Sequence, residues 1–229
     1  MFAEVTVFDL GLPGWGVALA ISALVLAAGG IMLALLIENR RKPRFRAIEV
    51  WYEKDTIERG FKRWHVRLIN QRPSGWLRWV ERNTANGVEA TVEFFDNGSV
   101  QSGPQIHAIW TERPRPLRDD LVVEAHRGDL TAGRPGNILV AFKHKGQKTA
   151  HQFDEKNYRP DGSFGSVESR NLPEGTYAVR LTLHYGGERH PFWFRLDNRE
   201  DELGTFVMDG PYGGNPLNPR KKFQLPELP

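Results

Sequence analysis

The sequence contains no cysteine among its 229 residues. This absence excludes disulfide bonds, zinc sites built on cysteine and catalysis by a thiol. It leaves the compartment open, because a chain of this length can bury a sizeable core without disulfide bonds in either redox environment.

Catalytic signatures are missing as well. The chain has no phosphate-binding glycine loop, no GxSxG, no HExxH and no DxDxDG calcium loop. Its seven histidines are scattered, whereas a metal site needs three or four convergent ligands. Asp96, Asp119 and Asp120 are expected to be turn carboxylates, with a calcium site as the alternative. The sequence therefore predicts no catalytic residue, no metal site and no cofactor.

Charged residues are absent from Trp15 to Ile37, a run of 23 residues. A helix of this length spans the hydrocarbon core of a bilayer. A cleaved signal peptide has a basic start and a shorter apolar run, but here acidic residues precede a long one. We therefore expect an N-terminal tail over residues 1–12 and an uncleaved transmembrane helix over residues 13–38. A cleaved signal peptide and a buried core helix are the alternatives.

Basic residues follow this run closely, and none precedes it. They lie in an expected juxtamembrane linker over residues 39–46. The positive-inside rule then places the N-terminus outside and the rest of the chain in the cytoplasm. The alternative is an extracytoplasmic domain, for which Asn97-Gly98-Ser99 would be a glycosylation acceptor in a eukaryotic lumen. The expected topology determinants are Arg40, Arg41, Lys42, Arg44 and Arg46.

The remaining chain is nearly neutral, although the pI is about 9.2. Residues 1–46 contain five basic and three acidic residues, so they account for +2 of the formal net charge of +3. Residues 47–229 therefore carry +1. Neutralising a nucleic-acid backbone needs a broad positive field, so nucleic acid is an unlikely partner.

Small residues form a stripe along the apolar run. They recur at alternating steps of four and three residues, and such a stripe lets the backbone of another helix approach closely. The spacing predicts a transmembrane partner helix, either from a second copy or from another subunit. The alternative is that the stripe reflects only the Gly, Ala and Ser content of the run. The expected packing residues are Gly16, Ala20, Ala23, Ala27, Gly30 and Ala34.

After Pro43 the pattern predicts about seven to nine short strands and no substantial helix, since the segment 54–59 is too short. Alternating apolar residues and turn signals at hairpin-like spacing are typical of an antiparallel β-sandwich. The fold class is therefore all-β, with a sandwich over residues 47–197 after a single transmembrane helix. The expected strands cover residues 46–53, 61–70, 88–96, 105–112, 121–126, 136–144, 175–185 and 190–197.

The segment NLPEGTYAVRLTL, residues 171–183, resembles the late strand of immunoglobulin-like, fibronectin-like and prealbumin-like sandwiches. In those domains a Pro-Gly turn often precedes a strand with an inward tyrosine, here Tyr177. The resemblance implies an immunoglobulin-like sandwich and nothing about chemistry. The cysteine pair of antibody domains is absent.

Residues 198–229 lose the alternation and are rich in Gly, Pro and Asn. This composition predicts an extended or disordered tail. Phe206-Val207-Met208 is the one segment in it that could add an edge strand.

The stretch RGFKRWHVRLINQRPSGWLRWVER, residues 59–82, combines three tryptophans with seven basic residues and one acidic residue. Three interpretations remain open. The tryptophans anchor the core beside a solvated arginine face, or the stretch meets the membrane surface, with indoles at the headgroups and arginines on anionic lipid. The third is a face for an acidic protein or single-stranded nucleic acid. The candidate binding residues are Trp64, Arg67, Trp76, Arg78 and Trp79.

These patterns together predict a membrane-anchored, non-enzymatic interaction or scaffold module, such as a subunit of a membrane complex. The first alternative is an extracytoplasmic domain that binds a glycan or another ligand, with tryptophans stacking on sugars. The second is an enzyme whose site is assembled from scattered residues.

Overall fold

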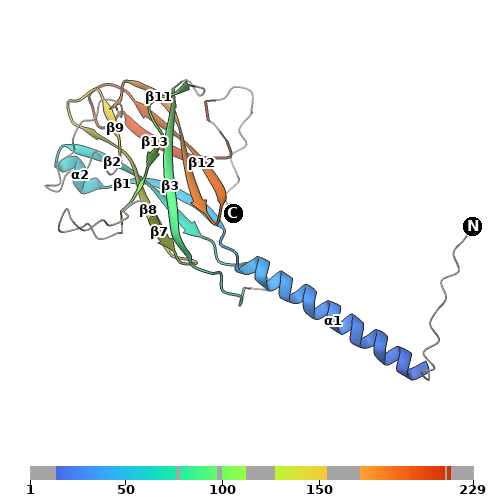
Figure 1. The fold of residues 1–229 in the computed structure, drawn as a ribbon. Coiled ribbons are helices and arrows are strands. Elements are labelled where there is room, and N and C mark those ends of the chain that lie inside the picture. Colours follow the sequence, from blue (N-terminus) through green and yellow to red (C-terminus); the bar gives the residue numbers. More distant parts are fainter. Residues whose placement is uncertain are drawn as a thin grey trace, which may run out of the picture. The chain divides into compact units, whose positions relative to one another are not determined.

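The structure is a computed structural model that describes residues 14–75, 78–96, 100–111, 127–153, 171–214 and 216–217. The chain divides into two compact units (Figure 1). The first contains the N-terminal helix and Pro73–Arg82, and the second contains Pro43–Arg72 and the chain from Asn83 onward.

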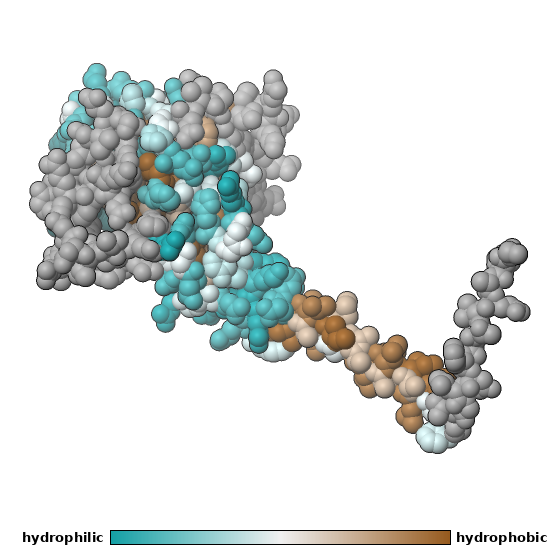
Figure 2. All heavy atoms as spheres, viewed as in Figure 1, coloured by the Kyte–Doolittle hydropathy of each residue, from teal (hydrophilic) through white to brown (hydrophobic). Residues whose placement is uncertain are grey.

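The N-terminal helix α1 covers Gly14–Arg41 and is exposed along its length. Its composition and length suffice to cross a membrane. Figure 2 shows α1 as apolar over most of its length and polar at its C-terminal end. The helix continues three residues beyond the expected end at residue 38, and it stops before Pro43, which disfavours helical geometry in the residue preceding it. Only residues 42–44 separate α1 from the first strand. The observed linker is therefore shorter than the expected one over residues 39–46.

Two antiparallel sheets form the second unit, and they confirm the predicted all-β sandwich after a single N-terminal helix. The first sheet has the order β1-β2-β8-β9-β10, with β6 also pairing with β8. Its strands are β1 (Phe45–Tyr52), β2 (Phe61–Asn70), β6 (Ile109–Trp110), β8 (Pro135–His144), β9 (Ala150–Gln152) and β10 (Asn171–Leu172). The five-residue helix α2 (Lys54–Glu58) joins β1 to β2.

The second sheet has the order β13-β12-β11-β3-β4, with β5 and β7 also pairing with β3. Its strands are β3 (Ala85–Asp96), β4 (Val100–Gln101), β5 (Ile106–His107), β7 (Arg127–Leu130), β11 (Gly175–Tyr185), β12 (Glu188–Asn198) and β13 (Phe206–Tyr212). The described chain thus contains 13 strand segments, several of them only two residues long, against the seven to nine expected.

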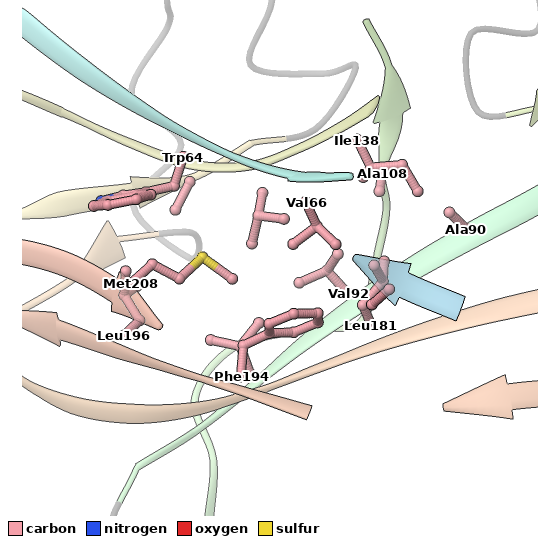
Figure 3. Close-up of a cluster of buried hydrophobic side chains, with 14 of the residues drawn as sticks. Trp64, Val66, Ala90, Val92, Ala108, Ile138, Leu181, Phe194, Leu196 and Met208 are labelled. Atoms are coloured by element: carbon pink, nitrogen blue, oxygen red, sulfur yellow. The ribbon is translucent and has the colours of Figure 1, made fainter. Parts of the chain in front are cut away.

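The core lies between the two sheets. Figure 3 shows Trp64, Val66 and Ile138 from the first sheet facing Phe194 and Leu181 from the second. All five side chains are at most 6% exposed. These residues occupy alternate positions of long strands, so burying one face of each sheet places them together.

The hairpin of β11 and β12 follows directly from its sequence. Tyr185 pairs with Glu188, and Gly186 and Gly187 have φ angles of +58° and +82°. A two-residue turn with both φ angles positive matches the twist of the strands, and glycine adopts it without strain. Tyr177 points inward as the resemblance implied, and its Oη donates a hydrogen bond to the carbonyl oxygen of Pro173 at 2.9 Å.

The expected strand over residues 105–112 is divided into β5 and β6. β5 pairs with β3 in the second sheet, whereas β6 pairs with β8 in the first. The chain therefore crosses from one sheet to the other at the buried Ala108. The expected strand over residues 121–126 lies outside the described residues, as do Asp119 and Asp120, and β7 was not predicted.

The sandwich extends beyond the predicted boundary at residue 197. β13 pairs with β12, and Phe206 and Met208 are buried in the core. The expectation that Phe206-Val207-Met208 could add an edge strand is therefore confirmed, whereas the prediction of a tail from residue 198 onward is wrong up to Tyr212. Gly and Pro in this stretch lowered its apparent strand character, but its alternate apolar residues still bury against the core.

Candidate functional site

Trp64, the first residue of the expected binding face, lies inside the sandwich. Its side chain is 6% exposed, and its Nε1 donates a hydrogen bond to the carbonyl oxygen of Phe206 at 3.1 Å. Strand alternation puts Trp64 on the same side of β2 as Val66 and Leu68. The interpretation of Trp64 as a surface binding residue is therefore wrong, and the core interpretation holds for this tryptophan.

Arg67 lies on the opposite face of β2. Its guanidinium is 5.5 Å from the ring centroid of Trp51, and it forms an ion pair with Glu49. Asn137 Oδ1 accepts hydrogen bonds from Arg67 Nε and from Trp51 Nε1, each at 3.2 Å. Arg67 and Trp64 therefore point to opposite sides of the first sheet.

Arg78 and Trp79 belong to Pro73–Arg82, which is part of the unit that contains α1. Both are exposed, and Trp79 is 65% exposed. Trp76 lies outside the described residues. The described members of the expected face are thus distributed over the core, the outer side of the first sheet and the other unit.

A different aromatic and basic group lies on the outer side of the second sheet. We call it the Arg180 cluster, and it consists of Glu93, Phe95, Arg180 and Trp193. Arg180 on β11 pairs in register with Glu93 on β3 and with Trp193 on β12. The strands thus hold a carboxylate, a guanidinium and an indole in one row.

The contacts within the Arg180 cluster are close and directional. Arg180 Nε and Nη2 donate to the two carboxylate oxygens of Glu93 at 2.8 and 2.9 Å. The guanidinium lies 5.1 Å from the ring centroid of Phe95 and 5.5 Å from that of Trp193. Two parallel hydrogen bonds and two aromatic neighbours fix the planar guanidinium in position.

Polar pairs extend the same face toward the sheet edge. Arg195 Nη2 lies 2.9 Å from the Asp197 carboxylate, which also accepts a hydrogen bond from Thr176 Oγ1 at 2.6 Å. Tyr212 pairs in register with Trp193 and donates to Asp209 Oδ1 at 2.7 Å. Burial, together with Asp209, raises the pKa of Tyr212 to about 12, so the phenol remains a donor.

This face combines charged and aromatic side chains. Its arginines are paired with carboxylates, so the face combines flat aromatic area with locally balanced charge. Trp, Tyr and Arg are the residue types that dominate protein interfaces energetically. Because the side chains are already held in place, binding to them would cost little of their conformational entropy.

The histidines do not assemble a metal site in the described part of the chain. His65 is fully buried on β2, stacked on Trp51 at 4.5 Å between ring centroids, with its Nε2 3.2 Å from Glu53 Oε1. Burial, assisted by the nearby Arg63 charge, lowers the pKa of His65 to about 4. His65 is therefore a neutral structural residue near pH 7.

The small-residue stripe and the topology determinants both lie in or near α1. At 100° per residue, the six stripe positions fall on one side of the helix. Five of them are exposed and Gly16 is half-buried. Arg40 and Arg41 form the last turn of α1, whereas Arg44 and Arg46 belong to the sandwich unit, where the backbone N–H of Arg44 donates to Asn70 Oδ1 at 3.0 Å.

Comparison with protein families, with curated proteins and with solved structures finds no match to this chain.

The Arg180 cluster was not predicted from the sequence. The alternation of residues 175–185 placed Tyr177 and Val179 inward, so it implied an outward Arg180. The hairpin turn at Gly186-Gly187 brings Trp193 beside it, whereas the register that brings Phe95 beside it links strands about ninety residues apart in the chain. No local pattern encodes that second pairing.

Proposed function

We propose that this protein is a single-pass membrane protein whose β-sandwich is a non-enzymatic interaction or scaffold module. The Arg180 cluster is the observation that carries the proposal, because it gives the outer side of one sheet a rigid aromatic and basic surface. Its partner would be a protein that contributes apolar and hydrogen-bonding groups, since the charges of the face are already balanced.

The membrane anchor in this proposal is α1. Its apolar length, its exposed sides and the basic residues at its C-terminal end support this role. The charge asymmetry favours an N-terminus outside and a cytoplasmic sandwich. The small-residue stripe on α1 would receive a partner helix, so the protein would be a subunit of a membrane complex.

A pair of matched positions tests the interaction face. Val207 on β13 is 41% exposed in the second sheet, and Ile48 on β1 is 43% exposed in the first. Two variants of the full chain carry a photoreactive benzoylphenylalanine, one at position 207 and one at position 48. Each variant is expressed in the native cells, and the membranes are irradiated. We expect a discrete protein adduct from the Val207 position and none from the Ile48 position.

Arg180→Ala is then added to the Val207 variant, with Arg67→Ala as the matched control. Arg67 is also an arginine stacked on an indole and paired with a carboxylate, but it lies on the other sheet. A central interface arginine contributes about 2 kcal/mol or more, so Arg180→Ala should weaken the adduct about thirty-fold. No adduct at Val207, or equal adducts in the two arginine variants, would overturn the proposal.

Glycan binding is the second candidate, and the pairing of Trp193 with Tyr212 on an outer sheet face favours it. It requires an extracytoplasmic sandwich. The absence of cysteine allows a clean test, in which a Val207→Cys variant is treated with a membrane-impermeant maleimide on intact cells. Labelling of Val207→Cys would place the sandwich outside and favour the glycan candidate. If Val207→Cys is not labelled but a Thr6→Cys variant is, the result supports the cytoplasmic module.

A further inference from the structure

The segment Pro73–Arg82, here called the juxtahelical loop, forms one compact unit with α1. Arg82 Nη1 donates a hydrogen bond to the carbonyl oxygen of Lys42 at 2.8 Å, and the Arg82 side chain is 7% exposed. Lys42 follows the last helical residue, Arg41. Carbonyl groups at a helix end lack intrahelical partners, and a buried guanidinium satisfies one here. The loop is therefore fixed at the C-terminal end of α1.

The juxtahelical loop carries an exposed tryptophan, Trp79. Trp79 is 65% exposed, whereas the adjacent Val80 is 2% exposed. An exposed indole is costly in water, but tryptophan is enriched where hydrocarbon meets headgroups, because its ring is apolar and its N–H is polar. The apolar run of α1 ends at Ile37. If α1 spans a bilayer, this end of the helix is where the acyl chains give way to headgroups, and the loop that carries Trp79 is fixed at the same end.

The charge at this end has one dominant sign. Residues 38–42 and 78–82 contain five basic and two acidic residues. Arg78 is exposed beside Trp79, and Arg40 and Arg41 form the last turn of the helix. Basic residues close to a bilayer are attracted to anionic phospholipid over about one Debye length.

We infer that the juxtahelical loop is a second membrane contact, in which Trp79 enters the headgroup region and Arg78 binds the phosphate of an anionic phospholipid. This inference rests on the proposed anchor role of α1. The contact would fix the rotation and tilt of the helix in the bilayer, since a transmembrane segment by itself leaves both free.

The test uses the full chain in nanodiscs of phosphatidylcholine, with or without phosphatidylglycerol. Because the chain has no cysteine, one introduced thiol carries the only fluorophore. Ser74→Cys labels an exposed position of the loop, Leu26→Cys labels the middle of α1, and Val207→Cys labels the sandwich. Nitroxide lipids quench the fluorophore either at the headgroup or deep in the acyl chains.

We expect the Ser74 label to be quenched by the headgroup nitroxide and the Leu26 label by the deep nitroxide, with the Val207 label unaffected. A quenched Leu26 label with an unquenched Ser74 label would overturn the loop contact and leave the anchor intact. An unquenched Leu26 label would overturn the anchor and, with it, the inference.

Two variants in the Ser74-labelled chain test the named side chains. Arg78→Glu should lower the quenching in the phosphatidylglycerol discs several-fold, because one basic residue near an anionic surface contributes about five-fold in binding. Trp79→Ser should lower it in both lipids. The matched exposed controls, Arg134→Glu and Ile48→Ser, should leave it unchanged.

Equal quenching with and without phosphatidylglycerol, unaltered by Arg78→Glu, would overturn the recognition of anionic headgroups. Unaltered quenching in Trp79→Ser would overturn the role of the indole. Both loop residues are exposed, so unfolding would not mimic either effect, and a thermal melt of each variant verifies this.

Discussion

Lys62 and Lys143 are direct cross-strand neighbours on β2 and β8, and both ammonium groups are buried. Lys62 Nζ donates to the carbonyl oxygens of Leu203 at 3.1 Å and Phe206 at 2.8 Å. Lys143 Nζ donates to Asn198 Oδ1 at 2.6 Å and to the carbonyl oxygen of Glu200. The two lysines thus tie the connection between β12 and β13 to the first sheet.

Lys143→Met should lower the free energy of unfolding by about 1–3 kcal/mol, because the side chain of Asn198 and the carbonyl of Glu200 lose a buried donor. Lys145→Met is the matched control, since Lys145 is exposed in the turn after β8. Denaturant unfolding of the detergent-solubilised chain, followed by circular dichroism, measures the difference. Equal stability of both variants would show that the lysine does not hold the connection.

Acid should destabilise the sandwich through His65. Its pKa is about 4 in the folded chain, against an ordinary histidine value of 6.5, so the unfolded chain binds the proton more readily between these values. The contribution is therefore fully present above pH 6.5 and is lost as the pH falls to 4, amounting to at most about 3 kcal/mol. His65→Gln should flatten the stability profile over this window, measured as denaturant midpoints at each pH. An unchanged slope would assign the acid sensitivity to other groups.

Gly128→Ala should destabilise the sandwich by about 1–3 kcal/mol, because a Cβ at Gly128 would lie 2.4 Å from Cδ2 of the Trp110 indole. The indole is 4% exposed and cannot move away freely, since its Nε1 also donates to the carbonyl oxygen of Val88 at 3.2 Å. Gly204→Ala is the control, as no atom lies within 4 Å of its Cβ position. Thermal melts compare the two, and a Gly128→Ala midpoint equal to that of the control would contradict the packing.

Helix association should distinguish two adjacent glycines. Gly29 and Gly30 both have open space where a Cβ would lie, so leucine at either position meets no obstacle within this chain. Gly30 lies on the small-residue stripe, and Gly29 is turned about 100° from Gly30, off the stripe. Gly30→Leu should abolish in-membrane crosslinking between helices, whereas Gly29→Leu should retain it. Identical crosslinking in both variants would remove the stripe as a packing surface.

Local alternation predicted the long strands that lie wholly within one sheet. Residues 61–70 and 175–185 coincide with β2 and β11, because each places alternate apolar side chains in the core between the sheets. The prediction of a single strand over residues 105–112 was wrong, because the chain changes sheets at Ala108 and no single periodicity describes both halves of the segment.

The surface was less predictable than the fold. Alternation placed Trp64 beside Val66 and Leu68, but composition grouped it with Trp79, which is exposed and belongs to the other unit. In β12 the run Phe192-Trp193-Phe194 is aromatic on both faces, so alternation alone does not say which ring points outward. Register with β11, which the Gly186-Gly187 turn sets, places Trp193 beside Arg180. The register with β3 that adds Glu93 and Phe95 is a long-range pairing that no local pattern displays.

The connection between α1 and β1 has a consequence for how partners reach the sandwich. Three residues separate the last helical residue from the first strand residue, so its contour length is about 14 Å. With α1 in a bilayer, as proposed, a domain on so short a tether would explore a thin layer beside the membrane and not the surrounding volume. Partners confined to the same membrane would then meet it at a high effective concentration, whereas a freely diffusing partner would first have to reach the membrane surface.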